Sequence, residues 1–528
     1  MFNPLGHSKE FRRRRFLNWL PLGLMYSFYY MGRYNLARAN AQISDTYGLS
    51  NADMGIIITA GFWVYAISFL INGPLTDRMG GRKGILAGAV GTMVVNVLMG
   101  LLIGFGFSWK IIFSFSMLYA ANMYFQSFGA VSIVKVNAAW FHVRERGVFG
   151  GIFGILISLG YWLAYGVGAL ILAHLPLMWV FIIPALLIGL ISIAGFLTIK
   201  DTPSQAGFQD FDTADASSGD QEEISVSYVL KKVFTTRVML IIAMAELFTG
   251  FVRNGIMQWF PKYTDRLYGA GHTDFFGLGL FIVGILGGMS AGIVSDKFFD
   301  SRRPPVAGLC YIGMFVFLII LGILGSPAVM PTSPARDYYA AVTEPALAAA
   351  KDRDDIKAAR VGLDAAAVKD IARETARQSG YADYDALPGA VRRNMEQVTG
   401  VESFSGKPKA RVQVAFEQVK FLVGHESSWL YILSTLVALM VGFFFVGTHG
   451  LLSGTSSMDF GGKKAAGTAA GLIDGMVYLG SGVSGFFLGT MVDKYGWNLW
   501  AYLLVPGAVA GFILTLFIWN AKPKPKQG

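Results

Sequence analysis

The chain has 528 residues, of which 54% are hydrophobic, 14% aromatic and only 15% charged. Soluble domains carry roughly 25% charged residues, so this composition excludes an ordinary soluble enzyme and indicates a surface that faces lipid. The net charge of +10 is typical of basic loops beside membrane helices, and we expect no nucleic-acid partner. The single cysteine, Cys310, excludes an intrachain disulfide.

Twelve apolar runs follow one another along the chain, each long enough to cross a bilayer. Their hydrophobicity is continuous rather than alternating, which predicts helices and excludes the strands of a membrane barrel. The sequence therefore predicts an all-α polytopic membrane protein with twelve transmembrane helices. The expected spans are residues 16–39, 52–72, 84–106, 111–136, 147–172, 177–199, 238–260, 274–295, 305–326, 428–452, 465–489 and 497–519.

The short loops on one side of these spans hold most of the basic residues. Basic clusters on that side lie at residues 12–15, 82–83, 144–146, 302–303, 463–464 and 522–526. The opposite short loops hold little beyond Lys110, Lys262, Arg266 and Lys494. By the positive-inside rule, both termini are expected in the cytoplasm.

Two segments interrupt the pattern of spans. Residues 200–237 form a polar, acidic stretch, which we expect to be a cytoplasmic linker between the half 1–199 and the half 238–528. Residues 327–427 begin with several prolines and then become rich in alanine and charge at helical spacing. They predict a soluble helical insertion on the outer side, between the ninth and tenth spans.

The two halves repeat one another. Asp77 and Asp296 follow apolar runs at equivalent places, and Arg33 and Arg253 lie inside the first apolar run of each half. A duplicated membrane unit of this kind is typical of secondary transporters built from two pseudo-symmetric six-helix halves.

A charged, glycine-containing motif lies in the loop between the second and third spans. We expect its residues, together with their counterparts in the second half, to form ion pairs and to meet helix ends at the cytoplasmic face, where they would act as a gate. The predicted gate consists of Gly73, Asp77, Arg78, Arg82, Lys83, Asp296 and Lys297.

The paired arginines are the main candidates for substrate binding. An arginine inside a membrane helix is costly and usually faces a protein interior or a wet cavity. Arg33 and Arg253 occupy equivalent points of two repeats and should therefore converge on the centre of the molecule. Because guanidinium matches phosphate and carboxylate oxygens and keeps its charge, the pair predicts a divalent oxyanion, most naturally a phosphate.

Weaker candidates surround this pair. Tyrosine hydroxyls and one lysine near the cavity could contact an anion, although such residues also anchor helices at the membrane interface. They are Tyr26, Tyr30, Tyr65, Tyr478 and Lys135. The intramembrane acids Glu246 and Asp474 are candidate proton sites, and Asp474 is also a candidate for polar groups of the substrate. We expect no catalytic residue, metal or cofactor, since the sequence has no phosphate-binding Walker loop, ligand cluster or nucleophile–base pair.

The chain resembles the major facilitator superfamily. The pattern Gly-x-x-x-Asp-Arg-x-Gly-x-Arg-Lys from Gly73 to Lys83 carries this resemblance, together with the twelve spans. Within the superfamily the chain is similar to the organophosphate:phosphate antiporters. The matching segments are residues 29–35, 253–261, 295–299 and 463–471, followed by 478–480, with Asp201-Thr-Pro203 at the linker.

The resemblance implies a function and a site. Arg33 and Arg253 would hold the phosphate, and Tyr26, Tyr30, Tyr65 and Tyr478 would line the cavity. The implied activity is exchange of a phosphorylated metabolite for inorganic phosphate by rocker-switch alternating access. A monomer in the cytoplasmic membrane of a bacterium is expected.

The sequence differs from the glycerol-3-phosphate carriers at two positions, and two other functions stay open. Phe69 and Ile157 stand where those carriers have a lysine and a histidine, so the organic half of the substrate is not defined. One alternative is transport of another organic anion such as a carboxylate, coupled to protons through Glu246 or Asp474. The other is a membrane sensor that binds a sugar phosphate and signals to a partner.

Overall fold

The computed structural model describes residues 7–213, 236–268, 274–300, 302–326, 329, 428–455 and 466–521. All regular structure in these ranges is helical, so the predicted all-α fold is confirmed. Nine helices among the described residues are long and apolar enough to cross a membrane. The other three predicted spans fall in α1 and α4, which carry more polar residues, and in the shorter α21.

The first half contains six membrane helices. They are α1 (Lys9–Tyr47), α2 (Asn51–Met79), α3 (Gly81–Gly104), α4 (Ile111–Trp140), α5 (Val143–Trp162) continued by a π-helical turn (Leu163–Val167) and α6 (Gly168–His174), and α7 (Trp179–Thr198). The chain then enters the predicted linker, which is described only at its two ends.

The second half repeats this order. Its helices are α9 (Arg237–Tyr268), α10 (Asp274–Phe298), α11 (Arg303–Leu324), α18 (Ser428–His449) followed by a π-helical turn (Gly450–Thr455), α20 (Ala466–Tyr495) and α21 (Val505–Phe517). The predicted insertion 327–427 lies outside the described residues apart from Val329. The proposed domain boundaries therefore stay a prediction.

The last predicted span, 497–519, differs from the structure. Two 3-10 turns, Trp497–Leu499 and Tyr502–Leu504, precede α21. The helix begins where Pro506 stands in its first turn, because proline fixes a helical φ and its missing N–H needs no partner there. The apolar run is continuous through this region, so hydrophobicity alone did not show the boundary.

Local sequence signals determine where the first helices begin and end. Ser8 caps α1 by accepting a hydrogen bond from the Phe11 N–H, and Gly48 ends it with a φ of 65°. Ser50 and Asp53 form a reciprocal capping box at the start of α2. Gly80 ends α2 with a φ of 90°, a conformation that favours glycine. The tight α2–α3 connection thus depends on a glycine of the predicted gate segment.

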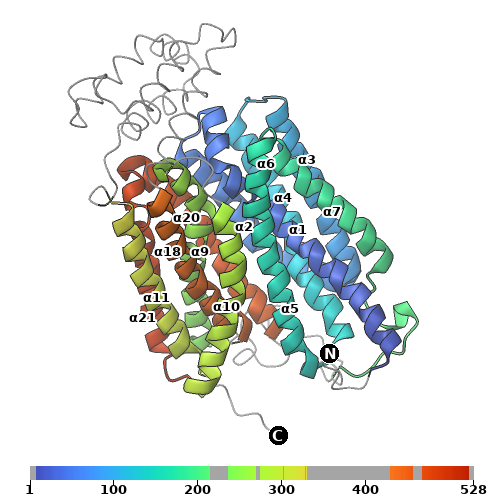
Figure 1. Ribbon diagram of the computed structural model, residues 1–528. Helices are drawn as coiled ribbons and strands as arrows, with labels where there is room; N and C mark the ends of the chain where they lie inside the picture. The colour runs from blue at the N-terminus through green and yellow to red at the C-terminus, as the bar shows by residue number, and fades with distance from the viewer. Residues whose placement is uncertain are drawn as a thin grey trace, which may run out of the picture.

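The two halves lie side by side, as Figure 1 shows for the blue-to-teal and the yellow-to-red helices. The helices that contact one another across the boundary are α2 with α20, α5 with α10 and α1 with α9. This is the pseudo-symmetric pairing that two equivalent repeats produce. We call the face at which α1 begins and α21 ends the inner face, and the opposite face the outer face.

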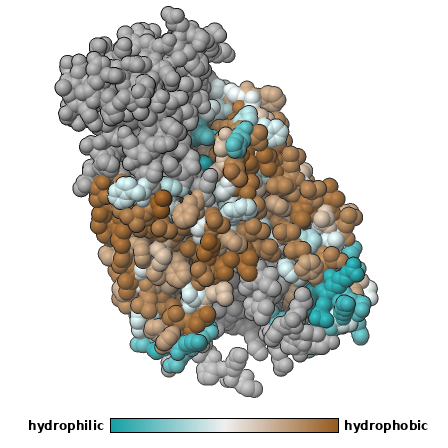
Figure 2. All heavy atoms as spheres, in the orientation of Figure 1, coloured by the Kyte–Doolittle hydropathy of each residue, from teal (hydrophilic) through white to brown (hydrophobic). Residues whose placement is uncertain are grey.

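A broad band of apolar side chains covers the molecule between these faces (Figure 2). Large apolar side chains are exposed there, including Phe113 at 63%, Leu190 at 67% and Leu197 at 69%. Exposed apolar surface of this extent would be unfavourable in water and is the normal surface of a protein in lipid. Hydrophilic residues gather toward the inner face in the same view.

Glycines allow α9 and α20 to pack closely within the second half. A methyl group added at Gly250 would lie 1.9 Å from the Val477 carbonyl oxygen, and one added at Gly480 would lie 1.9 Å from the Leu247 carbonyl oxygen. Neither helix can accept a side chain at this crossing without moving apart from the other.

We therefore predict that Gly250→Ala lowers the stability of the folded protein by about 1–3 kcal/mol, because the added methyl group overpacks the helix crossing. Thermal unfolding of the purified protein in detergent measures the effect as a fall in Tm. Gly292→Ala is the matched control, since a Cβ there meets nothing within 4 Å. Equal Tm values for the two variants would contradict the close α9–α20 contact.

Candidate anion-binding site

Arg33 lies on α1, and its side chain is fully buried. Its Nε donates a hydrogen bond to Gln126 Oε1 at 2.8 Å, and one Nη donates to the Tyr65 hydroxyl at 2.8 Å. The guanidinium also lies over the rings of Tyr30 and Tyr65, at 4.8 and 4.4 Å from their centroids. The other terminal nitrogen is buried and has no hydrogen-bond partner among the described residues.

A network of buried side-chain amides holds Gln126, the residue that accepts a hydrogen bond from Arg33. Gln126 donates to Asn122 Oδ1 at 3.3 Å, and Asn96 donates to the same oxygen at 3.0 Å. Asn122 in turn donates to the Gly32 carbonyl at 3.0 Å. This network joins α1, α3 and α4, and it was missed from the sequence. Side-chain amides inside the third and fourth apolar runs were the available signal, because buried polar groups require partners.

Arg253 is the equivalent residue of the second half, on α9, and is 5% exposed. One Nη lies 3.5 Å from the Tyr34 hydroxyl of the first half. Its guanidinium lies over the Tyr478 ring at 5.4 Å. The second arginine is therefore in contact with aromatic residues of both halves.

Neither guanidinium has a carboxylate within ion-pair distance in the described part of the chain. Neutral hydroxyls, an amide and aromatic ring faces are their partners. A buried charge that is not paired with an opposite charge is unfavourable. Two such cations at equivalent points of two halves therefore form a site suited to an anion.

A cavity of about 420 Å³ opens beside this pair. Apolar and aromatic side chains form most of its wall, and the polar members are Asn137, His449, Asp474 and three tyrosines. The lining residues are Tyr26, Tyr30, Phe69, Ala130, Ile133, Val134, Asn137, Ala138, Phe141, Ile157, His449, Asp474 and Tyr478. Three of the predicted tyrosines, Tyr26, Tyr30 and Tyr478, thus face the cavity, as do Phe69 and Ile157.

An aromatic layer separates the arginines from this cavity. Tyr478 contacts Tyr65 with ring centroids 4.4 Å apart and stacks near Phe69 at 6.0 Å. Tyr30 belongs to the cavity wall while its ring also contacts Arg33. Neither Arg33 nor Arg253 lines the cavity. An anion in the cavity would reach the guanidinium groups only after these rings move.

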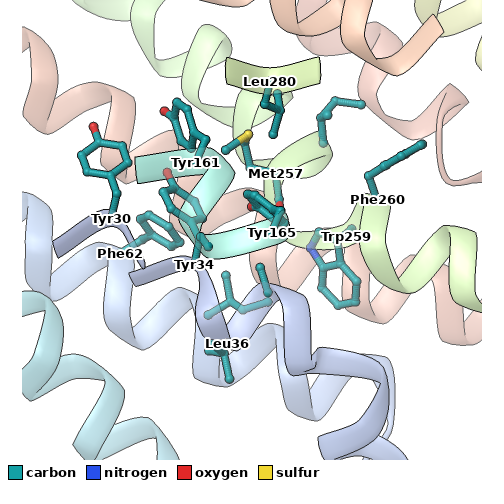
Figure 3. Close-up of a cluster of buried hydrophobic side chains, with 14 of the residues drawn as sticks. Tyr30, Tyr34, Leu36, Phe62, Tyr161, Tyr165, Met257, Trp259, Phe260 and Leu280 are labelled. Atoms are coloured by element: carbon teal, nitrogen blue, oxygen red, sulfur yellow. The ribbon is translucent and has the colours of Figure 1, made fainter. Parts of the chain in front are cut away.

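Further tyrosines extend the layer along the boundary between the halves. Figure 3 shows Tyr30, Tyr34, Tyr161 and Tyr165 beside Met257 of α9. The Tyr30 and Tyr161 rings lie 5.1 Å apart, and the Tyr165 hydroxyl donates to the Met257 carbonyl. Tyr34, Tyr161 and Tyr165 were not singled out from the sequence, because a tyrosine in an apolar run is equally typical of packing.

The wall contributed by the second half is acidic. Asp474 lines the cavity and accepts a hydrogen bond from Ser453. His449 lies between two acids, with Nδ1 2.9 Å from Glu246 and Nε2 4.0 Å from Asp474. His449 was missed from the sequence, although an ionisable residue in a membrane span is the same signal that indicated the two acids.

The outer face is closed by contacts between the halves. Arg266 of α9 forms a buried ion pair with Asp45 of α1, and Lys262 donates to Ser44 at 2.6 Å. Asp493 at the end of α20 accepts hydrogen bonds from the backbone of Asn51 and Ala52 at 3.0 and 2.7 Å, which caps the start of α2. All of these contacts join a helix of one half to a helix of the other at the outer face.

The predicted gate residues lie at the inner face, and their contacts stay within one half. Asp77 pairs with Lys135 at 2.9 Å, and Asp296 pairs with Arg303 at 2.6 Å. Lys135 is thus placed against the gate motif and does not line the cavity. Arg82 donates from its side chain to the Phe196 carbonyl at 2.6 Å.

The remaining gate residues lie on α2, α3 and α10. The backbone N–H of Arg82 donates to Asp201 at 2.7 Å, so the linker entry caps the start of α3. Arg78, Lys83 and Lys297 are exposed at the same face, and a Cβ at Gly73 would meet nothing within 4 Å. The substrate-binding and gating roles of all these residues stay a prediction.

The helical halves, the lipid-facing band and the central cavity together define a polytopic membrane transport protein. The chain matches the model of the Major Facilitator Superfamily over residues 22–333. It belongs to that superfamily, and the predicted fold is confirmed.

Curated relatives bear out the predicted resemblance to the phosphate-ester carriers. The chain is 23% identical to the glycerol-3-phosphate transporter of Bacillus subtilis, over 98% of each chain. It is 22% identical to a probable hexose phosphate transport protein of Chlamydia pneumoniae, over 99% of this chain and 97% of that one. It is also 26% identical to the membrane sensor protein UhpC of Salmonella typhimurium, over 56% of this chain and 66% of the relative.

Solved structures show the same fold. A D-xylose–proton symporter superposes with a TM-score of 0.57 at 15% identity, covering 96% of this chain and 98% of that chain. A bacterial homologue of the human lysosomal transporter Spinster, in an inward-facing unoccupied conformation, superposes with a TM-score of 0.55 at 14% identity, covering 98% and 96%.

We predict that Asp45→Asn loosens the outer face, because Arg266 then loses its nearest carboxylate and keeps only Asp265, at 3.9 Å on its own helix, and breaking a buried pair costs about 3–5 kcal/mol. Spin labels at Phe107 and Leu499, which are exposed residues of the two halves, report the separation between them. Double electron–electron resonance should show a new population at longer distance in the variant.

The matched control is Asp296→Asn, which removes an ion pair at the inner face with a 57% exposed carboxylate. Its distance distribution should match that of the parent protein. An unchanged distribution in Asp45→Asn would contradict a role of the buried pair in closing the outer face.

Proposed function

We propose that this protein is a secondary transporter that exchanges a phosphorylated metabolite for inorganic phosphate. The transporter works by rocker-switch alternating access, in the cytoplasmic membrane of a bacterium, as a monomer with both termini in the cytoplasm. Curated relatives named as glycerol-3-phosphate, hexose phosphate and phosphoglycerate transporters support the substrate class.

The observation that carries this proposal is the pair of buried arginines without counterions. Arg33 and Arg253 come from equivalent helices of the two halves and contact only neutral partners in the described chain. A phosphate dianion supplies two charges and several acceptor oxygens, and so matches two guanidinium groups. A monocarboxylate has two acceptor oxygens and a single charge and would leave one guanidinium without an opposite charge.

The same pair explains why transport would be an exchange. Without an anion, two like charges oppose the approach of the halves, and the empty protein changes face slowly. A bound phosphate attracts both arginines and lowers the free energy of the state in which the halves close around it. The protein then returns only with another anion bound, so one substrate is exchanged for another.

The cavity accommodates the organic half of the ester. Phe69 and Ile157 present apolar surface there, and Asp474 and His449 provide polar contacts on the opposite wall. An ester with an apolar face and hydrogen-bond donors fits this combination. The organic group would lie in the cavity while its phosphate displaces the tyrosine hydroxyls at the arginines.

A sensor is the second candidate, because one relative carries the name membrane sensor protein. A sensor would bind the phosphate ester at the same arginines without moving it across the membrane. Binding of phosphoesters in detergent, combined with no flux in vesicles, would favour this function over transport.

Exchange in reconstituted vesicles tests the proposed function. Purified protein in vesicles loaded with phosphate should take up labelled phosphate from outside. Arg33→Lys and Arg253→Lys should each lower the exchange rate about 100-fold, because hydrogen bonds between charged groups contribute up to about 3 kcal/mol and lysine cannot form the planar fork.

Arg303→Lys is the matched control, since Arg303 pairs with the exposed Asp296 at the inner face and should retain the parent substrate ranking. Competition by phosphate esters then ranks the substrates. We expect that dicarboxylates do not compete with labelled phosphate. Exchange that survives both arginine substitutions, or that no phosphate compound inhibits, would contradict the proposal.

A further inference from the structure

Three titratable side chains form a chain from the cavity into the interior of the second half. Asp474 and His449 line the cavity, with side chains 30% and 31% exposed. Glu246 lies behind them, fully buried, with Oε2 2.9 Å from His449 Nδ1. They come from three helices, α20, α18 and α9. The phosphate proposal gives Asp474 and His449 only polar contacts to the organic half of the ester and leaves the buried Glu246 without a role.

Glu246 is the unusual member of the set. Its second oxygen, Oε1, is buried and has no hydrogen-bond partner in the described structure. A carboxylate that is half-satisfied and removed from water is costly as a bare charge. The 2.9 Å contact between Glu246 Oε2 and His449 Nδ1 needs a proton on one of the two atoms, since two acceptors do not approach one another so closely. A further proton on this set would reduce the unbalanced negative charge of its two acids.

The local backbone is also irregular at this point. The α-helix α18 ends at His449, and the π-helical turn Gly450–Thr455 follows at once. Ser453 of that turn donates to Asp474. π-helical turns inside helices are rare and occur often at functional sites. The turn places the Ser453 hydroxyl on Asp474, the acid that also lies 4.0 Å from His449 Nε2.

Charged and titratable residues of α1, α9, α11 and α20 lie near this set. Arg253 lies two turns further along α9 and acts electrostatically on His449. Tyr311 of α11 faces Glu246. Tyr26 and Tyr30 of α1 and Tyr478 of α20 face the cavity, and α2 and α4 present only non-titratable side chains to it.

A count of charges shows what closing the cavity requires. A phosphate dianion would balance Arg33 and Arg253. The two acids and a protonated His449 then leave one negative charge on the cavity wall. When the halves close and water leaves, an unbalanced charge is strongly disfavoured. One more proton on this set makes the closed cavity neutral.

From this arrangement we infer that the loaded transporter changes face only when a proton neutralises the Glu246–His449–Asp474 set. The proton enters from the cavity at Asp474 or His449 and is shared with the buried Glu246. It binds and leaves without any covalent step. This inference rests on the proposed phosphate exchange. It requires that a proton be bound together with the anion whenever the transporter changes face.

The test is the pH profile of phosphate–phosphate exchange, with the same pH on both sides of the vesicle membrane. Phosphate titrates identically in every experiment, so differences between variants report the protein. Wild-type exchange should fall on the alkaline side by up to about tenfold per pH unit, as expected for loss of one required proton. In Asp474→Asn a neutral amide replaces the acid, and the alkaline fall should be absent or moved to higher pH.

Glu246→Gln removes the same single charge and provides a second comparison if Asp474→Asn is not recovered as a monodisperse protein. Glu10→Gln, a carboxylate-to-amide change at an exposed residue in the first turn of α1, should follow the wild-type profile. Superimposable profiles for wild type and the neutral variants would overturn this inference alone. Absence of exchange at every pH in wild type would overturn the proposed function and this inference with it.

Discussion

The structure depends on two positive charges held inside a membrane protein without counterions. Arg33 and Arg253 are tolerated because amide, hydroxyl and aromatic groups partly solvate them, yet none of these partners cancels a full charge. Each half supplies one cation and the rigid helices that position it. The two charges therefore concern both halves of the molecule. The free-energy cost of burying them would fall most when one anion lies between the two halves and contacts both guanidinium groups.

The contacts of the two halves differ between the outer face and the inner face. The buried Asp45–Arg266 pair and the Asp493 cap hold the outer face closed, whereas the ion pairs of the inner-face motif stay within their own halves. Among the described residues, the ion pair that crosses the boundary therefore lies at the outer face. On the proposed function, the molecule would change face by exchanging one set of crossing contacts for another while each half stays intact.

Much of the fold could be predicted from sequence, because lipid requires helices and helices in lipid require long apolar runs. The internal repeat then placed Arg33 opposite Arg253. Finer features were not predictable, because they depend on which helices meet. Lys135 reaches Asp77 on a neighbouring helix, and the tyrosine layer covers the arginines through packing across both halves. The place of His449 between two acids that are distant in sequence likewise depends on which helices meet.

The central claim is that the two arginines bind one anion together. A crystal structure of the protein grown with arsenate tests this claim most directly, because arsenic can be located by its anomalous scattering and arsenate has the shape and charge of phosphate. We predict one strong anomalous peak between the Arg33 and Arg253 guanidinium groups, with the covering tyrosines displaced. A peak found only at the basic loops of the inner face, with the central arginines unoccupied, would contradict the account.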